Sequence, residues 1–554
     1  METTSSFSRS IGDFLNGALV KKAGIIAIRI GAFAPGTFSG FSWPAAITGL
    51  KYDSRNIAPG DLYFALPGLH TDGHDFISQA VDRGAKAVVY QQKEYSEFRE
   101  GIIYIRVKDS RFAMSPIVDA FYNFPSRKMG IIGVTGTEGK STTVYLIYQL
   151  LKLLGRKAAF ISTVQHGDGL TEKWNSEHQT TPEAVTLHLL LAQMQRNGAE
   201  FAVVESSSHG LSKKTNRLGD VDFDVGVMTC VTHEHLEFHG TWEQYRSDKA
   251  ELFRALDASP TAHKKQGPTE EFTVPSFGVV NADDASAEYF AAATRQKTYS
   301  FSVRGAKADL SIKKLESEAG GNKYEVFVSS IGKTVNIADN LSGAFNAGNV
   351  LASILVVSNL LSIDIEKLVP LVPHLKPVRG RMTAVNLGQP FEVLVDYAHT
   401  PSSFLTIFPP LKERIKRSGG RLISLFGSAG ERDTKKRSQQ GEIAARYSDL
   451  VFLTDEDPRG EEPMDILEEI AQGCETSQGC FADQGCENMI RNETLFLIPD
   501  RRKAIRKAFS LAKPGDLVLL LGKGHENSII YASGTLNYDE ITEAENALKE
   551  AGIS

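Results

Sequence analysis

The sequence predicts an α/β protein of three domains: an N-terminal α/β domain, a central domain with a parallel sheet, and a C-terminal Rossmann-like domain. Short apolar runs alternate with longer stretches of helical periodicity, which is typical of parallel strands joined by crossover helices. The chain has 554 residues, too many for a single core, because a domain averages about 150 residues. We therefore place the domains at residues 1–126, 127–375 and 376–554.

In the N-terminal domain a helical stretch covers Phe76–Arg83. Strands are expected at residues 62–66, 87–90 and 101–107. The segment FPSRK at 124–128 is interpreted as a linker, because Pro125 disfavours helix at the residue before it.

The central domain opens with an apolar strand at 130–134, a glycine loop and a helix at 141–154. Further strands are expected at residues 158–162, 201–205 and 224–229. A boundary is expected near Pro377. The C-terminal domain repeats the pattern, which indicates a second doubly wound sheet, with strands at residues 391–396, 421–426, 449–454 and 516–521.

Composition excludes several classes of protein. Apolar residues make up 42% and charged residues 23%, as in a soluble globular protein. A net charge of −6 argues against a nucleic-acid partner, which usually meets a basic face. No signal peptide is visible at the start. The longest apolar stretch, Val350–Leu361, is too short to span a bilayer, so we expect a buried helix and no membrane insertion.

Four cysteines indicate a reduced, cytoplasmic protein. Cys474, Cys480 and Cys486 lack the usual spacing of zinc ligands and fall in a polar stretch, so we expect a surface loop over 473–488. A second polar stretch, 259–271, is expected to be a loop insertion.

The motif with the clearest chemistry is Gly136-Thr137-Glu138-Gly139-Lys140-Ser141-Thr142. Between a strand and a helix, its backbone N–H groups can cradle phosphates, while Lys140 adds a cation and Ser141 a hydroxyl for Mg²⁺. Val134 replaces the first glycine of the usual P-loop, so this is a variant loop. The alternative is a purely structural glycine turn.

Acidic and histidine side chains follow the next strands. Glu205 ends the buried strand FAVVE, where a carboxylate can hold nucleotide-bound Mg²⁺; alternatively it is a charge near a helix N-terminus. The segment Thr232–Gly240 (THEHLEFHG) is dense in metal-binding side chains. Zinc is the second choice of metal, since no cysteine pair accompanies the histidines.

Eight motifs occur in an order that resembles the Mur ligases, specifically the UDP-N-acetylmuramoyl-tripeptide synthetases. They are GTEGKST, ESSSHGL, THEHLEFHGTWEQYRSDKAELF, LSGAFNAGN, DYAHTPSS, AGERDTKKR, EDPRGEEP and GKGHE. The resemblance runs from about Asp53 to Glu540. It implies an N-terminal UDP-binding domain, a central ATPase domain and a C-terminal domain that binds an amino acid.

The resemblance also implies a reaction. A monomeric enzyme of peptidoglycan synthesis would use ATP to activate UDP-N-acetylmuramoyl-L-alanyl-D-glutamate as an acyl phosphate, and a diamino acid would displace phosphate. Two Mg²⁺ ions would screen the anions. Ser141 and Glu205 would serve one ion and His235 the other, and Lys249 would carry a carbamate that makes it a metal ligand.

The remaining site residues are implied in the same way. Residues implied in nucleotide binding outside the glycine loop are Asn281, Asn346, Arg381, Asp396 and His399. Those implied in binding the UDP-linked substrate are Ser54, His70, Thr71, Asp72, Gly73, His74, Thr180, Thr181, Ser207 and Arg217. Those implied in binding the amino acid are Arg432, Glu456, Asp457, Arg459, Gly522 and Glu526.

The identity of the diamino acid stays open. Arg459 suits the distal carboxylate of meso-diaminopimelate, but the diaminopimelate pattern is Asp-Asn-Pro-Arg and this chain has Glu456-Asp457-Pro458-Arg459. An ion pair between Asp457 and Arg459 would favour L-lysine or L-ornithine. Two alternatives to the whole reading are a folylpolyglutamate synthetase-like ligase and a non-catalytic scaffold with the same fold.

Overall fold

A computed structural model describes residues 7–31, 46–68, 71–92, 95–175, 179–232, 236–258, 262–266, 271–318, 320–478, 489–490 and 494–553. The chain forms two compact units. The first comprises residues 1–140, 151–280 and 284–299, and the second comprises 141–150, 281–283 and 300–554. Each unit is described by itself.

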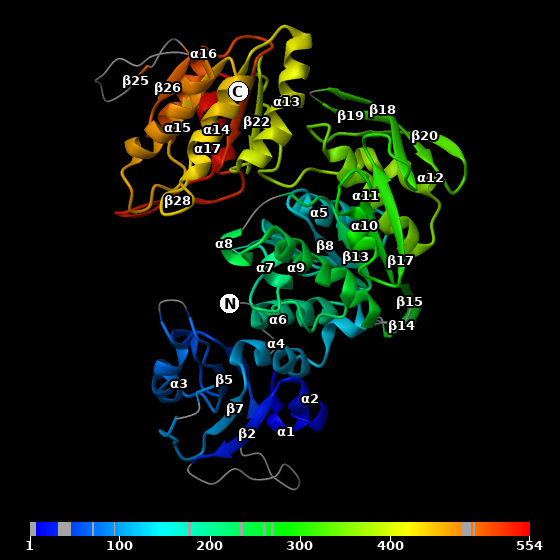
Figure 1. The fold of residues 1–554 in the computed structure, drawn as a ribbon, viewed down its shortest axis with the longest axis vertical. Helices are drawn as coiled ribbons and strands as arrows, with labels where there is room; N and C mark the ends of the chain where they lie inside the picture. The colour runs from blue at the N-terminus through cyan, green and yellow to red at the C-terminus, as the bar shows by residue number, and fades with distance from the viewer. Residues whose placement is uncertain are drawn as a thin grey trace. The chain divides into compact units, whose positions relative to one another are not determined.

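The first unit begins with a small sheet in the order β2-β7-β6-β5-β4, drawn in blue in Figure 1. Its strands are β2 (Ile25–Ile30), β4 (Gly49–Lys51), β5 (Asp61–Phe64), β6 (Ala87–Tyr90) and β7 (Ile103–Val107). β4 to β7 are parallel and β2 is antiparallel to β7. The expected strands and the expected helix, α3 (Ile77–Asp82), are therefore present.

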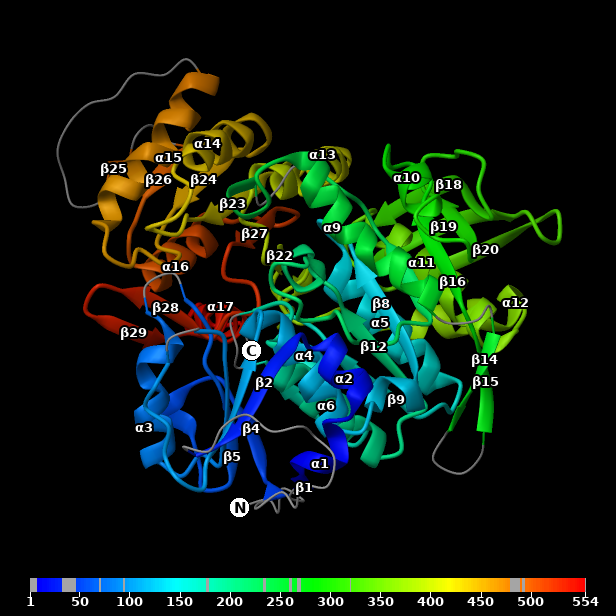
Figure 2. The same ribbon diagram turned by 60° about the horizontal axis from the view of Figure 1, so that its bottom comes forward.

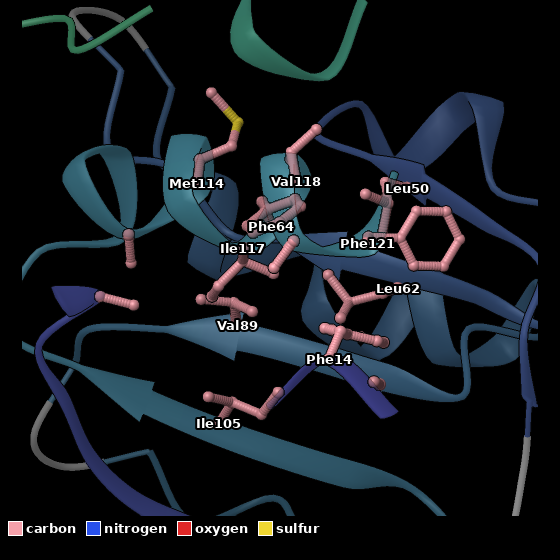
Figure 3. Packing of buried hydrophobic residues seen from close by; sticks show 14 of the residues in the cluster. Phe14, Leu50, Leu62, Phe64, Val89, Ile105, Met114, Ile117, Val118 and Phe121 are labelled. Carbon is pink, nitrogen blue, oxygen red and sulfur yellow. The ribbon is translucent and has the colours of Figure 1, made fainter. Parts of the chain in front are cut away.

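The core of this sheet is built against α4 (Ser110–Phe121). Figure 3 shows Ile117 of this helix turned toward Val89 of β6, whereas Met114 and Val118 of the same buried cluster point to the opposite side of the helix. The same buried cluster also includes three residues of α6 (Ala184–Arg196), namely Ala184, Val185 and Ala192. The expected linker at 124–128 is a turn of 3-10 helix, Pro125–Lys128, preceded by Phe124 at φ 54°.

The rest of the first unit carries parallel strands in the order β9-β12-β8-β13-β16, with β10 and β11 antiparallel beyond β9. Figure 2 shows β9, β12 and β8 side by side. The strands are β8 (Gly130–Thr135), β9 (Ala158–Ile161), β10 (Gln165–Gly167), β11 (Glu172–Trp174), β12 (Phe201–Glu205), β13 (Val225–Met228) and β16 (Phe277–Asn281). The helices that accompany them are α6, α7 (Ser208–Leu211), α8 (Leu236–His239), α9 (Trp242–Ala255) and α10 (Ala287–Ala291). Helix α5 (Lys140–Leu153) follows the glycine loop, and its residues 141–150 belong to the second unit.

The polar segment that was expected to be a loop insertion contains a strand instead. The expected loop at 259–271 contains β14 (Ala262–Gln266), which pairs with β15 (Glu271–Pro275) as a hairpin. Lys265 is buried and its Nζ lies 3.2 Å from Asp222 Oδ2, Asp224 Oδ2 and Ser126 O. A lysine is almost never fully buried unless it is paired, so these partners explain why a polar segment folds back as a strand.

The second unit contains strands that the parallel pattern did not predict. β17 (Lys297–Ser302) is parallel to β18 (Leu310–Glu318), and β18, β19 (Gly321–Val328) and β20 (Lys333–Asp339) form an antiparallel meander. The following helices are α11 (Asn346–Leu361), α12 (Ile365–Leu368) and the 3-10 helix Val369–His374. Most of α11 is buried, as expected for Val350–Leu361.

The C-terminal part of the second unit is a sheet in the order β21-β22-β27-β23-β24-β26-β25. Its five central strands are parallel. The strands are β21 (Thr383–Ala384), β22 (Glu392–Asp396), β23 (Leu422–Phe426), β24 (Leu450–Leu453), β25 (Met489–Ile490), β26 (Leu495–Leu497) and β27 (Leu517–Leu521), and a separate hairpin joins β28 (Ser528–Tyr531) to β29 (Gly534–Asn537).

Helices cover both faces of this sheet, coloured yellow to red in Figure 1, which confirms the doubly wound prediction. One apolar cluster joins the sheet to α13 (Pro401–Ser418), α14 (Lys435–Tyr447) and α15 (Pro463–Gln478), and another joins it to α16 (Arg501–Leu511) and α17 (Glu540–Glu550).

The expected surface loop at 473–488 is wrong for its first cysteine. Cys474 lies on α15, is 3% exposed, and its Sγ is 3.3 Å from Gly441 O of α14. Gly473 and Gly441 let the two helices approach closely, because a Cβ at either would collide with the other helix's backbone. Cys480 and Cys486 lie outside the described residues.

Across the described ranges, no single helix is long and apolar enough to cross a membrane. One pair, Asn346–Leu361 and Ile365–His374, passes the length and composition test only jointly, and it is bent by 117°.

Candidate active site

The carboxyl ends of parallel strands in the first unit bring the glycine loop and Glu205 together. β8 and β12 pair in register, so that Glu205 lies opposite Val134, two residues before Gly136. Ligands of open α/β sheets bind at this edge. The geometry therefore places an acidic side chain beside the loop suited to phosphate.

The glycine loop is held in shape by its neighbours. At Gly136 φ is +152°, and a Cβ there would collide with Thr229 Oγ1. Thr137 N donates to Cys230 O at 2.7 Å, and Thr229 Oγ1 donates to Glu138 O at 2.5 Å. The strand that ends at Met228 thus fixes the loop, and only glycine fits at its first position.

Lys140 opens helix α5 and folds back over the loop. Its Nζ donates to Thr137 O at 2.7 Å. The next residue, Ser141, is 4% exposed, while Thr142 is half-buried and Gly139 has φ +79°. A helix N-terminus, an adjacent lysine and a hydroxyl together form the usual setting for a polyphosphate.

Lys249 is buried against this loop. It lies on α9, is 2% exposed, and its Nζ donates to Gly136 O at 2.6 Å. The ammonium also lies 4.5 Å from the ring centroid of Tyr245, whose hydroxyl is 3.0 Å from Thr137 Oγ1. From the sequence alone, an isolated helical lysine is expected to be exposed to solvent. In the fold, Lys249 instead points toward the glycine loop.

The oxygen donors beside the loop suit a hard divalent cation. Both carboxylate oxygens of Glu205 accept hydrogen bonds from Thr163, at 2.8 Å from its backbone N and 2.9 Å from its Oγ1. Each oxygen keeps a lone pair for a metal. Carboxylate and hydroxyl oxygens are ligands that Mg²⁺ prefers, so the side chains of Glu205 and of Ser141 each have the donor chemistry for that ion.

His235 lies outside the described residues. Within the ranges that are described, no group of three or more His, Cys, Asp or Glu side chains is arranged to hold a metal.

A buried network next to Lys249 was not anticipated from the sequence. His239 Nδ1 is 2.7 Å from Asp248 Oδ2, and His239 Nε2 is 3.1 Å from Ser208 Oγ. Burial alone would raise the pKa of Asp248, but hydrogen bonds from His239 and Gln244 lower it. The network ties α9 to α7, and so fixes the helix that carries Lys249.

Three residues implied in binding the muramoyl peptide lie in contact with one another. Thr181 Oγ1 is 2.9 Å from Ser207 Oγ, and Arg217 Nη1 donates to Thr181 O at 3.0 Å. Arg217 Nη2 also binds Glu183 Oε1 at 2.8 Å. Thr180 is half-buried next to them. The structure thus joins residues that are 36 positions apart in sequence.

In the N-terminal sheet, the implied uridine-binding segment is ordered by its own contacts. Ser54 Oγ donates to Gln79 Oε1 at 2.8 Å. His74 Nε2 accepts from Gln91 N at 3.0 Å, so its Nδ1 carries the proton shared with Asp72 Oδ1 at 2.6 Å. Both nitrogens of His74 are used inside the domain, which makes this ring a support for the segment.

Two further positions of that segment are described. A Cβ at Gly73 would lie 2.7 Å from Leu66 O, which explains the glycine. Thr71 is exposed, and His70 lies outside the described residues.

In the second unit, Asn346 is linked to the glycine-loop helix. Asn349 Nδ2 donates to Asn346 Oδ1 at 2.9 Å, and Thr143 Oγ1 donates to Asn349 Oδ1 at 3.1 Å. Thr143 stands two residues after Ser141, so the chain of bonds ends in the first turn of the helix that follows the loop. Asn281, at the end of β16, accepts from Asp283 N at 3.0 Å.

The other residues implied in nucleotide binding gather at the carboxyl end of β22. Asp396 accepts from Met382 N at 2.8 Å and Ala398 N at 2.7 Å, and burial raises its pKa. The Arg381 guanidinium lies 4.7 Å from the Tyr397 ring centroid, and His399 Nδ1 lies 2.8 Å from Tyr397 O.

In the implied amino-acid pocket, the ion pair suggested between Asp457 and Arg459 is not formed. Asp457 does not pair with Arg459; its Oδ1 instead accepts from Lys523 Nζ at 2.9 Å and from Ile530 N at 3.0 Å. Lys523 is 1% exposed and also binds Glu526 Oε2 at 2.6 Å. Burial works against its ammonium, but the two carboxylates more than offset this and raise its pKa.

Arg459 is left without an ion pair in the described part of the chain. Its backbone has φ +57°, and its N donates to Ile530 O at 2.9 Å. Its Nε is buried with no hydrogen-bond partner. Arg432 is exposed on the loop after β23.

Glu456 is a buried carboxylate whose pKa is raised. It is 6% exposed, its Oε2 lacks a hydrogen-bond partner, and burial raises its pKa to about 6. A Cβ at Gly522 would lie 2.8 Å from that oxygen. The loops that carry EDPR and GKGHE therefore meet here.

Comparison with known proteins gives a consistent set of similarities. Three family models match: "Mur ligase family, catalytic domain" at residues 46–122, "Mur ligase middle domain" at 134–357, and "Mur ligase, glutamate ligase domain" at 380–524. The UDP-N-acetylmuramyl-tripeptide synthetase of Treponema denticola is 49% identical over 520 residues, covering 91% of this chain and 94% of that protein.

Two further relatives carry a more specific name. The UDP-N-acetylmuramoyl-L-alanyl-D-glutamate–2,6-diaminopimelate ligase of Geobacillus thermodenitrificans is 34% identical, covering 91% of this chain and 95% of that protein. A solved structure of a ligase of that name is 26% identical with a TM-score of 0.60, covering 94% and 98% of the two chains.

Proposed function

The chain belongs to the Mur ligase family and is an ATP-dependent, ADP-forming ligase of peptidoglycan synthesis, and from this premise we propose that it adds a diamino acid to UDP-N-acetylmuramoyl-L-alanyl-D-glutamate. The observation that carries the proposal is the contact of buried Lys249 with the glycine loop. A buried lysine that contacts a loop suited to phosphate fits an acyl-phosphate mechanism better than a scaffold role.

The proposed reaction has two steps. The D-glutamate carboxylate attacks the γ-phosphorus of ATP, and the bond to the β–γ bridging oxygen breaks to release ADP. The amine then attacks the acyl phosphate, phosphate leaves with the bonding electrons, and the amine loses a proton. Both steps bring anions together, so catalysis depends on positive charge and on N–H donors.

The residues of the glycine loop would orient and stabilise ATP. Its N–H groups and Lys140 would bind the β- and γ-phosphates. Asn281, Asn346, Arg381, Asp396 and His399 are proposed as further nucleotide contacts. Mg²⁺, when bound, would supply charge to screen the repulsion between carboxylate and phosphate, and Ser141, Glu205 and His235 are its proposed ligands.

Lys249 is proposed to work as a carbamate. Its Nζ would add to CO₂ and lose a proton, so that a cation becomes an anionic oxygen ligand. Tyr245 and Gly136 hold the side chain where such a ligand would reach the loop. This accounts for a buried lysine at a place where an ammonium would otherwise compete with Mg²⁺.

The UDP-linked substrate is proposed to bind along the first unit. The peptide would contact Thr180, Thr181, Ser207 and Arg217, which lie together. The UDP end would meet the N-terminal sheet at Ser54 and residues 70–74.

The charged side chains of the implied amino-acid pocket support a diamino acid as the second substrate. Asp457 and Glu526 together hold one ammonium group, that of Lys523, and a substrate with a distal ammonium needs the same partners. Arg459 supports a distal carboxylate. The pocket therefore suits L-lysine, L-ornithine or meso-diaminopimelate, with Arg432, Glu456 and Gly522 as further proposed contacts.

The experiment is a phosphate-release assay with ATP, Mg²⁺ and the UDP-dipeptide, run with a panel of the three diamino acids and with L-glutamate and a folate as controls. We expect release only with the UDP-dipeptide and a diamino acid. Release with the folate and L-glutamate would instead identify a folylpolyglutamate synthetase-like enzyme, and no release with any pair would identify a scaffold. The proposal extends to a cytoplasmic location and to a monomeric state. Light scattering of the purified chain tests the monomeric state.

A further inference from the structure

The two loops of the amino-acid pocket are joined beneath their surface by one buried arginine. Arg501 begins α16 and its side chain is 0% exposed. Its Nη1 donates to Asp455 O at 3.0 Å, and its Nη2 donates to Leu521 O at 2.7 Å. These carbonyls immediately precede Glu456 and Gly522, so one guanidinium binds the backbone from which each loop departs.

The strands that lead into the two loops are not neighbours in the sheet, and of the side chains on the loops themselves Lys523 bonds Asp457 across at 2.9 Å. β24 precedes the Glu456 loop and β27 precedes the Gly522 loop, but β23 lies between them in the sheet. Their spacing is therefore not fixed by ladder hydrogen bonds. The planar guanidinium, with donors in a rigid fork, bonds to the chain at the carboxyl ends of both strands.

Arg501 is itself oriented by Glu540 at the start of α17. Its Nε and Nη2 bind the two carboxylate oxygens at 2.8 and 2.6 Å, and Tyr538 Oη donates to Glu540 Oε2 at 2.5 Å. Glu540 is 0% exposed. A bidentate, fully buried pair leaves the guanidinium one orientation, and its remaining N–H groups serve the two loop carbonyls.

We infer that Arg501, held by Glu540, is a positioning residue that sets the distance between the Glu456 and Gly522 loops and thereby the affinity for the incoming amino acid. It contacts no substrate, and it acts through the backbone of Asp455 and Leu521. The inference rests on the proposed function of this pocket. Its effect falls on the second step of the reaction, because the residues proposed for ATP and the UDP-dipeptide do not contact Arg501.

The test compares Arg501→Lys with a matched control, Arg421→Lys. Arg421 forms a similar pair with Asp516, at 2.7 and 3.1 Å, and binds Leu511 O at 2.7 Å, but at the amino ends of β23 and β27. For each variant, KM is measured for the amino acid, ATP and the UDP-dipeptide. The acyl phosphate formed without an amino acid is trapped with hydroxylamine, and thermal denaturation reports folding.

We expect Arg501→Lys to raise KM for the amino acid about tenfold or more, since small displacements of binding groups are costly. Trapped acyl phosphate and KM for ATP should stay near the parent values, and Arg421→Lys should change neither KM nor trapping. Tyr538→Phe, which removes only the hydroxyl bond to Glu540, gives a milder test if Arg501→Lys fails to fold, with the same selective rise in KM.

Two outcomes in folded variants would overturn the inference: an unchanged KM for the amino acid, or a parallel loss of trapping and amide formation. The proposed function fails differently, since the unmodified protein would then trap no acyl phosphate or use no diamino acid.

Discussion

The choice of diamino acid depends on a charge balance that the structure makes testable. Lys523 holds Asp457 and Glu526 with a single positive charge, and it is nearly fully buried. Asp457→Asn removes one negative charge beside the place proposed for the distal end of the substrate. The carboxylate of meso-diaminopimelate should then bind better, and the ratio of kcat/KM for diaminopimelate over lysine should rise.

The size of the shift follows from Coulomb's law. One charge at a separation on the order of 8 Å, with an effective dielectric constant of about 20, is worth about 2 kcal/mol. That is about thirtyfold in the ratio of kcat/KM. Lys523→Met removes the positive charge instead, so the ratio should move by a similar factor toward lysine and ornithine.

The assay is ligase turnover with all three amino acids on the parent, both single variants and the double variant. The double variant removes both charges, so its ratio should return toward that of the parent. Asp449→Asn is the control, because Asp449 pairs with Lys412 at 2.6 Å near the amino end of β24. If both single variants shift the ratio in the same direction, or neither shifts it, the electrostatic reasoning is refuted.

Three other variants test the rest of the site. Lys140→Ala should slow turnover at saturating ATP about 10³-fold, because it removes a cation from the phosphates, and turnover near that of the parent would contradict its role. Lys249→Ala should lose most activity and regain part of it with a small carboxylic acid in the medium, whereas a Lys249→Arg variant as active as the parent would rule out a carbamate. Burial raises the pKa of Glu456 from 4.5 to about 6, so the folded protein holds this proton more tightly and loses about 2 kcal/mol of stability as the pH rises from about 4.5 to 6. Glu456→Gln should therefore unfold at a higher temperature than the parent at pH 7.5 but not at pH 4, and an equal difference at both values would show that burial does not set the charge.

Much of the fold was predictable because it follows from local patterns. Uninterrupted apolar runs such as 130–134 and 517–521 are buried on both faces, as strands of a parallel sheet must be. The meander of β18 to β20 was missed although its signal was present. In β19, Tyr324, Val326 and Val328 are buried and alternate with more exposed residues. This period of two differs from the continuous apolar runs that predict the strands of the parallel sheets.

Contacts that depend on tertiary placement were not predictable in the same way. The motifs located Lys249, but its burial against Gly136 joins residues 113 positions apart. The partners Thr163 and Arg501 belong to no recognised motif, and Tyr245 lies within the motif around Lys249; the role of each is identified only by what it contacts. The hairpin around Lys265 was missed because its composition is polar, and its stability comes from acids elsewhere in the chain.

The failed pairing of Asp457 with Arg459 shows how sequence proximity misleads at such a site. The two residues are close in sequence, and opposite charges at that distance suggest an ion pair. The positive φ of Arg459 turns the chain there, and its N–H joins Ile530 O. Asp457 is turned toward Ile530 N and Lys523, which is 66 residues away. A buried carboxylate needs several donors at once, and the meeting of two loops at a sheet edge supplies them where a single neighbouring guanidinium does not. Pairing in such a pocket is therefore decided by which strands end side by side, and this is information that the spacing of residues within one motif does not contain.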